Sequence, residues 1–320
     1  MSLLRHLKTA FGFTSGQNST SDAGTVASSQ HLMPRRTMLA AGSVLIAVLG
    51  IALYQAAVAS DRDAGSVVYE VKSTYSHIRI RRNGNVLTLV FVRDSGEEAF
   101  ESQVNLKAPH VLKFNYLQHM FASYLVQPEQ KNVMIVGLGG GSMVHFLQKY
   151  DPEVAIEAVE IDPIVVQLAE KYFKVKQNEK VKLIVADAFE HLKTTTSKYD
   201  TIYMDAFLKP SADTDETGVP LKLRTIEFYK QMQGLLTENG SVVYNINPHD
   251  QMEADIATIR EAFPQTYVFN LPNRGGVVVV GSMQKTRVAN PELISAGKSI
   301  DTRFKAGFSF QDIARRVRKN

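Results

Sequence analysis

Residues 133–142 read VMIVGLGGGS, an apolar run that passes directly into a turn with four glycines. Such a run is typical of a buried parallel strand, and the glycines after it let the backbone turn sharply and approach a ligand closely. Residues 141–150 follow with the pattern of a helix, whose N-terminus would face that ligand. The segment predicts a strand–turn–helix unit, although a glycine-rich turn alone is a weak signal for a nucleotide.

Strand and helix patterns alternate from this unit to residue 283. Predicted strands cover residues 154–161, 181–187, 199–206, 241–247, 267–271 and 276–283, and predicted helices cover residues 163–173, 188–193, 224–236 and 252–263. Near-continuous apolar strands that alternate with helices predict a mostly parallel sheet covered on both faces. The closing pair, residues 267–283, resembles the sheet of adenosylmethionine-dependent methyltransferases. The fold class is therefore α/β, with a Rossmann-like sheet of the adenosylmethionine-dependent transferase type.

A small antiparallel β region is predicted before this sheet, over residues 67–107. Its short β-rich runs at 67–71, 77–81 and 86–92 include a turn signal at Asn83-Gly84. A helix is expected over residues 111–125 from its apolar spacing. The Rossmann-like catalytic domain is then placed at residues 108–285, and a C-terminal tail, docked or disordered, at residues 286–320.

The N-terminal segment contains an uncharged run. Residues 1–37 are polar and basic and are predicted to be disordered. Residues 38–59 are 22 residues without a charge, and a spanning helix needs about 20. They predict a transmembrane anchor or an export signal cleaved near Ala59. Basic residues before the run place the following domain on the extracytoplasmic side, so a membrane-anchored protein is expected.

Composition excludes several kinds of site. The chain has 320 residues, a net charge of +4 and no cysteine, so disulfides, thiolate metal sites and cysteine nucleophiles are ruled out. The basic residues are spread out, which predicts no nucleic-acid partner. The histidines lack metal-ligand spacing, so no metal site is expected. No permanently bound cofactor is expected either.

Carboxylates follow successive predicted strands. Glu160 ends the second strand, Asp187-Ala188 the third, and Asp205 the fourth. The carboxyl ends of parallel strands meet at one edge of the sheet, where ligands bind. These carboxylates, together with Gly137 and Gly139, predict an adenosyl-ligand site. Asp187 also has a simpler interpretation, in which it is the N-cap of the next helix.

A dinucleotide such as NAD is disfavoured. The turn lacks the third glycine of the G-x-G-x-x-G pattern, because Ser142 stands at that position.

Several segments resemble, in order, the spermidine synthase family and its bacterial spermidine synthase-like branch. These are STYSHI at 73–78, GNVL at 84–87, VGLGGGS at 136–142, VEID at 159–162, DA at 187–188 and YDTIYMD at 199–205. The resemblance runs from about residue 67 to residue 283. It implies a transferase of polyamine biosynthesis that moves an aminopropyl group from decarboxylated adenosylmethionine, its co-substrate, to a small-molecule amine.

The same resemblance implies roles for individual residues. Gln103 resembles the family's donor-contacting glutamine, and Tyr116 resembles a tyrosine of its substrate site. Glu160 would bind the ribose of the donor, and Asp187 with Ala188 would bind the adenine. Asp205 would orient or deprotonate the attacking amine, a role that also follows from chemistry, because a protonated amine is not nucleophilic. A homodimer is a further expectation.

Departures from the family pattern concern the amine site. Gly140 stands where the family's loop usually carries Asp, Leu208 replaces a second Asp, and Gln118 replaces Glu. The loop 209–220 contains three acidic residues and is interpreted as a gate or as an exposed polar loop.

Three functions therefore stay open. They are an aminopropyltransferase with an altered acceptor, a methyltransferase that uses ordinary adenosylmethionine, and a non-catalytic membrane-associated family member. The missing charge at Gly140 favours the second slightly, because an aspartate there would repel the carboxylate of adenosylmethionine.

Overall fold

The computed structural model describes residues 65–206, 214, 218, 220–272 and 275–319. The predicted segments 1–37 and 38–59 lie outside the described residues, and so does most of the loop 209–220. The predicted domain boundaries stay predictions.

Seven strands form the central sheet in the order β10-β11-β9-β8-β5-β6-β7. Five of them are parallel: β5 (Asn132–Val136), β6 (Ala155–Glu160), β7 (Val181–Val185), β8 (Tyr199–Met204) and β9 (Leu236–Ile246). The other two, β10 (Gln265–Asn270) and β11 (Val277–Ser282), are antiparallel at one edge. This confirms the predicted α/β, Rossmann-like sheet. Strand order reverses between β5 and β8, where α/β sheets bind ligands.

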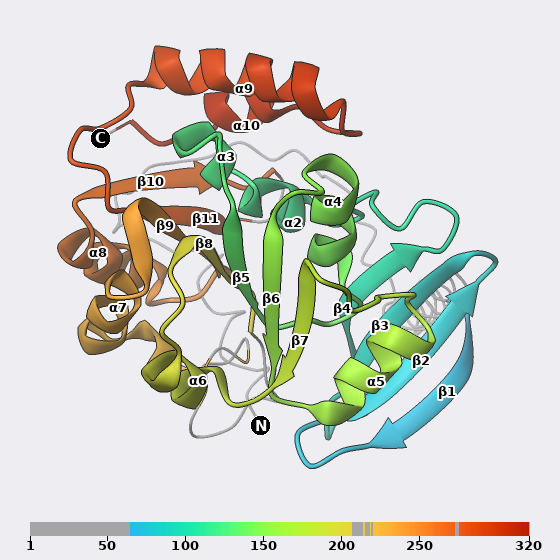
Figure 1. The fold of residues 1–320 in the computed structure, drawn as a ribbon. Helices are drawn as coiled ribbons and strands as arrows, with labels where there is room; N and C mark the ends of the chain where they lie inside the picture. Colours follow the sequence, from blue (N-terminus) through green and yellow to red (C-terminus); the bar gives the residue numbers. More distant parts are fainter. Residues whose placement is uncertain (1–64, 207–213, 215–217, 219, 273–274, 320) are drawn as a thin grey trace, which may run out of the picture. The chain divides into compact units, whose positions relative to one another are not determined.

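Helices pack on both faces of this sheet, because its strands are apolar on both sides. On one face Ile135 belongs to a core shared with α2 (Asn115–Met120), α3 (Ser123–Val126), α4 (Ser142–Tyr150), α9 (Asn290–Phe304) and α10 (Phe310–Arg315). On the other face Met134 and Val136 meet α6 (Ala188–Thr194), α7 (Ile226–Gln233) and α8 (Met252–Ala262). Helix α9 lies next to both α3 and α10 (Figure 1). The expected single helix over 111–125 is instead the two short helices α2 and α3.

A four-stranded antiparallel sheet precedes the central sheet, as predicted. Its strands are β1 (Ser66–Lys72), β2 (His77–Asn83), β3 (Val86–Val92) and β4 (Glu98–Asn105). Apolar side chains of β2, β3 and β4 pack on α5 (Pro163–Lys171) and on Phe173. This packing brings β4 to the glycine turn, since the Ser102 hydroxyl oxygen lies 3.4 Å from that of Ser142.

Strand β4 contains a β-bulge at Glu101. Leu89 pairs with Ser102 and Val90 with Phe100, so Glu101 has no opposite residue on β3. A bulge interrupts the alternation of side chains between the two faces of a sheet, and bulges re-aim side chains near functional sites.

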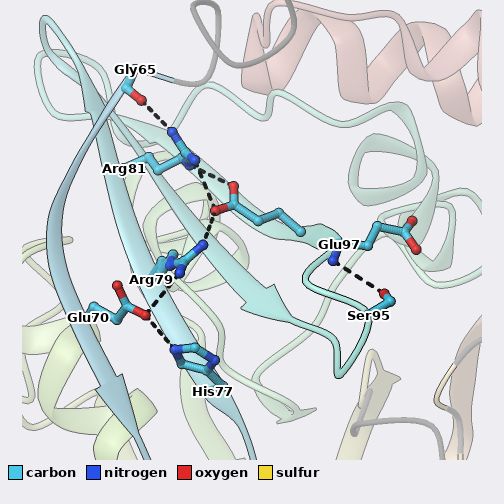
Figure 2. Close-up of polar contacts among 8 residues, drawn as sticks. Gly65, Glu70, His77, Arg79, Arg81, Ser95 and Glu97 are labelled. Atoms are coloured by element: carbon cyan, nitrogen blue, oxygen red, sulfur yellow. Dashed lines mark hydrogen bonds and ion pairs between the residues drawn. The ribbon is translucent and has the colours of Figure 1, made fainter. Parts of the chain in front are cut away.

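Charged side chains hold the β4 strand against β2 across the intervening β3 (Figure 2). The Glu98 carboxylate accepts hydrogen bonds from Arg79 at 2.9 Å and from Arg81 at 2.6 and 2.9 Å. Burial alone would raise the pKa of Glu98, but the bonds from Arg81 and Arg79 outweigh it and lower that pKa. Figure 2 also shows Glu70 between Arg79 and His77.

Neutralising this carboxylate tests its contribution to stability. Glu98→Gln removes an ionised partner of two guanidinium groups, and hydrogen bonds to charged groups contribute about 1.5–3 kcal/mol. We expect the melting temperature at pH 7 to fall by roughly 2–4 °C for each kcal/mol lost. Exposed Glu97 next to it provides the matched control. Equal melting temperatures for Glu98→Gln and Glu97→Gln would contradict this assignment.

The predicted localisation requires a correction. Among the described residues the longest helix is α9 with 15 residues, whereas a spanning helix needs about 20. No helix in that part of the chain is long and apolar enough to cross a membrane. This finding contradicts the predicted membrane-anchored protein with its domain on the extracytoplasmic side. We withdraw that prediction together with its exported alternative; the run 38–59 itself lies outside the described residues.

Candidate active site

The glycine turn after β5 touches the backbone at the end of β8. Gly137 has φ of +95°, and a Cβ atom there would lie 2.2 Å from the carbonyl oxygen of Asp205. Gly139 and Gly141 also have positive φ, at +53° and +71°. Only glycine adopts this turn without strain, and the turn leaves the N-terminus of α4 facing the space beside it.

A cavity with about 1030 Å³ of open space lies at this edge of the sheet. Seven of the eight residues predicted from the sequence for the site line it: Tyr116, Gly137, Gly139, Glu160, Asp187, Ala188 and Asp205. They come from α2, from the ends of four neighbouring strands and from the turns after them. These seven positions lie close together because the carboxyl ends of parallel strands meet at one edge of the sheet; their roles in binding stay predictions.

Glu160 is oriented by backbone amides. Its carboxylate accepts hydrogen bonds from the amides of Leu138 and Asp162, both at 3.0 Å. Burial raises the pKa of Glu160, and the bonds from these amides oppose the rise. Each carboxylate oxygen keeps a second lone pair, so Glu160 can still accept hydrogen bonds from a ligand in the cavity.

Asp187 is the N-cap of α6, as its simpler interpretation predicted. One carboxylate oxygen accepts from the amide of Phe189 at 2.9 Å. The other accepts from the ammonium of Lys222 at 2.8 Å. Capping does not exclude ligand binding, because the two oxygens together offer about four acceptor positions. The Lys222 contact comes from a segment far along the chain, and nothing in the local sequence indicated it.

Asp205 lies between two polar side chains. The hydroxyl of Tyr116 and the amide nitrogen of Asn245 each donate to it at 3.3 Å. Burial raises the pKa of Asp205 to about 6, although both of these hydrogen bonds act to lower it. A carboxylate whose pKa is near neutrality is suited to accept a proton at physiological pH.

Gln103 is the one predicted residue that does not line the cavity. Its side-chain amide donates to the Thr88 hydroxyl at 3.1 Å. The cavity is lined instead by Glu101 and Ser102, two consecutive residues at the bulge of β4. Burial, and next the charge of Asp205, raise the pKa of Glu101 to about 7. Sequence reasoning missed Glu101 because the resemblance to the family indicated Gln103, two residues further along β4.

The positions where the sequence departs from the family pattern differ in their surroundings. A Cβ atom at Gly140 would lie 2.9 Å from the Ser102 hydroxyl and 2.9 Å from the ring of Phe173. Gln118 donates to the carbonyl of Leu112 at 3.2 Å and is not part of the cavity lining. Leu208 and the acidic residues Asp213, Asp215 and Glu216 lie outside the described residues. Among the described residues no three His, Cys, Asp or Glu side chains are grouped to hold a metal ion.

Known proteins resemble the chain over most of this region. Residues 114–287 match the spermine/spermidine synthase domain. A polyamine aminopropyltransferase of Vibrio vulnificus (strain CMCP6) is 30% identical over 222 residues, which cover 68% of this chain and 72% of that protein.

Two more distant similarities are to a methyltransferase and to a solved spermidine synthase. An eEF1A lysine and N-terminal methyltransferase of Mus musculus is 26% identical over 176 residues, covering 53% of this chain but 25% of that protein. A solved spermidine synthase in complex with the transition state analogue AdoDATO shares the fold, with a TM-score of 0.59, 20% identity, and coverage of 78% and 83% of the two chains.

Proposed function

Because the chain belongs to the spermine/spermidine synthase family, we propose that it is an aminopropyltransferase of polyamine biosynthesis. It transfers the aminopropyl group of decarboxylated adenosylmethionine to an amine acceptor. The observation that carries this proposal is the position of Asp205, a buried carboxylate with a pKa of about 6 in the cavity formed by the glycine turn. A non-catalytic relative has no need for such a group at this place.

The donor's adenosine occupies the side of the cavity formed by β6 and β7. Glu160, already oriented by two backbone amides, accepts hydrogen bonds from the ribose hydroxyls. Asp187 accepts from the adenine amino group with the lone pairs that its N-cap and Lys222 contacts leave free. The glycine turn lets the backbone approach the donor closely. AdoDATO in the solved spermidine synthase supports a donor of this class.

The chemical step is a displacement at carbon. The lone pair of the neutral amine nitrogen attacks the methylene carbon bonded to the sulfonium, and a new C–N bond forms. The C–S bond breaks, its electron pair stays on sulfur, and methylthioadenosine leaves as a neutral thioether. The nitrogen's proton passes to the Asp205 carboxylate, which Tyr116 and Asn245 hold in place. Holding both substrates in line supplies much of the acceleration.

The acceptor's chain occupies a smaller cavity beside Asn245. That cavity is also lined by Ala206 and Leu223, which it shares with the donor cavity. The Asn245 side-chain oxygen is buried and accepts no hydrogen bond within the described part of the chain. An amine N–H donates to this oxygen while the attacking nitrogen faces Asp205. The predicted homodimer stays a prediction.

Methyl transfer from ordinary adenosylmethionine is the second candidate. Gly140 places no charge against the donor's carboxylate, and a methyltransferase is among the distant relatives. That similarity covers 25% of the methyltransferase, so the aminopropyl reaction is the better supported.

Acid pH is expected to stop the reaction. Asp205 must be ionised to take a proton, and its pKa is about 6. We therefore expect kcat/KM for the donor, measured at saturating acceptor, to fall tenfold for each pH unit below about 6. A rate that stays constant from pH 8 to pH 5 would rule out a carboxylate of this pKa as the base.

Calorimetry with both forms of the donor tests the proposed function. The full chain is titrated with decarboxylated adenosylmethionine and, separately, with adenosylmethionine. We expect tighter binding of the decarboxylated form. Preferential binding of ordinary adenosylmethionine would favour methyl transfer, and binding of neither would refute both enzymatic functions.

A further inference from the structure

We propose that Glu101 selects the donor: its carboxylate faces the end of the donor cavity that takes the aminopropyl amine, and it rejects a donor that has kept its carboxylate. This inference rests on the proposed function and deepens it. It concerns a residue that the sequence did not single out.

The bulge in β4 is what brings Glu101 into the cavity. In a regular strand neighbouring side chains point to opposite faces. Here Ser102 and Glu101 both line the donor cavity, because Glu101 is the unpaired residue between the pairs Leu89–Ser102 and Val90–Phe100. A bulge keeps Ser102 packed inward while it turns its neighbour toward the same space.

Glu101 lies at the reacting end of the cavity. Ser102 beside it lies 3.4 Å from Ser142, at the N-terminus of α4. On its other side the charge of Asp205 is close enough to raise the pKa of Glu101. A donor whose ribose is bound by Glu160 therefore directs its sulfonium and the aminopropyl chain toward Glu101.

The glycine turn cannot supply this negative charge itself. The position where the family's loop usually carries Asp is Gly140, and a Cβ atom there would come within 2.9 Å of both Ser102 and Phe173. Contacts this short require the neighbours to move. The carboxylate of Glu101 reaches the cavity from β4 and takes the place of the missing aspartate.

Within the described residues no hydrogen bond or ion pair to the Glu101 carboxylate is formed, and the attraction of Arg93 is the smallest of the effects on its pKa. An ammonium group placed beside Glu101 and Asp205 would therefore favour ionisation of both. The aminopropyl chain ends in such an ammonium. Adenosylmethionine bears a carboxylate on the carbon that carries this nitrogen, which would place a third negative charge near the pair.

Donor selectivity measured on three proteins tests this role. The full-length wild type, Glu101→Gln and the matched control Glu97→Gln are titrated calorimetrically at pH 8 with decarboxylated adenosylmethionine and with adenosylmethionine. The donor preference is the dissociation constant for adenosylmethionine divided by that for decarboxylated adenosylmethionine. We expect this ratio to be at least about tenfold smaller in Glu101→Gln than in the wild type, which corresponds to about 1.4 kcal/mol. Glu97→Gln, exposed on the same hairpin, is expected to keep the wild-type ratio. Glu101→Asp, which keeps the charge, is expected to retain part of the preference.

The outcomes separate the two proposals. A wild type that prefers the decarboxylated donor, together with an unchanged ratio in Glu101→Gln, would refute the role of Glu101 and leave the proposed function standing. A wild type that binds neither donor would refute the proposed function first. If Glu101→Gln does not fold, the wild type at pH 5.5 and pH 8 serves instead. The charged groups that act on Glu101 are Asp205 and Arg93. Protonation of Glu101 should make the ratio of the dissociation constants smaller at pH 5.5 than at pH 8. An equal ratio at both pH values would refute the role of Glu101 in donor selection.

Discussion

Asp205→Asn is expected to lower kcat by about 10²–10⁴-fold, the usual contribution of a positioned acid–base group. The amide cannot accept the proton of the attacking amine, so the nitrogen would have to lose it to water. The substitution keeps the size of the side chain, and Tyr116 and Asn245 can still hold it in place. Donor affinity should fall far less than kcat, because the proposed adenosine contacts lie at Glu160 and Asp187 and the Glu101 carboxylate still faces the donor's ammonium.

The measurement is the steady-state rate of methylthioadenosine release together with the donor dissociation constant. Asp250→Asn, the same chemical change at an exposed position, is the matched control and should behave as wild type. An unchanged kcat in Asp205→Asn would remove Asp205 from the reaction. A loss of donor affinity as large as the loss of rate would make Asp205 a binding group instead.

Gly137→Ala is expected to abolish donor binding and to destabilise the fold. The added methyl group would lie 2.2 Å from the Asp205 carbonyl oxygen at a φ of +95°. Gly137 and Asp205 directly follow the paired strands β5 and β8, so the backbone at neither position can move aside easily. Backbone strain of about 1–3 kcal/mol adds to an overpacking cost of about 1–3 kcal/mol. The melting temperature should fall by roughly 2–4 °C for each kcal/mol.

Gly307→Ala is the control for this substitution. A Cβ atom at Gly307 meets no heavy atom within 4 Å, and its φ is not in the left-handed region. That variant should keep its melting temperature within about 1 °C of wild type, as surface substitutions usually do. A Gly137→Ala variant with wild-type donor affinity would show that the turn is not in direct contact with the donor.

Much of the fold could be predicted because its signals are local. Apolar runs such as residues 133–136, buried on both sides, identify parallel strands without knowledge of their neighbours. The closing antiparallel pair β10–β11 was likewise visible as two short apolar runs. The two-part helix over 111–125 was missed, because the apolar pattern continues through the break between α2 and α3.

The candidate site likewise contains residues that the sequence could group and contacts that it could not predict. Four of its residues lie at or just after the ends of strands: Gly137, Glu160, Asp187 and Asp205. Topology alone brings these strand ends together, so sequence order was sufficient to group the four residues. Glu101 depends on a bulge, which inserts one residue without a distinctive sequence. The contact from Lys222 to Asp187 depends on tertiary packing of a distant segment. Interactions of these two kinds require the structure.

Product analysis of the full chain tests aminopropyl transfer most directly. The protein is incubated with decarboxylated adenosylmethionine and a diamine, and the products are quantified by mass spectrometry. We predict methylthioadenosine and the aminopropylated amine in equal amounts, and neither product from Asp205→Asn on the same time scale. Absence of methylthioadenosine with every diamine tried, or formation of adenosylhomocysteine from adenosylmethionine in its place, would contradict the assignment.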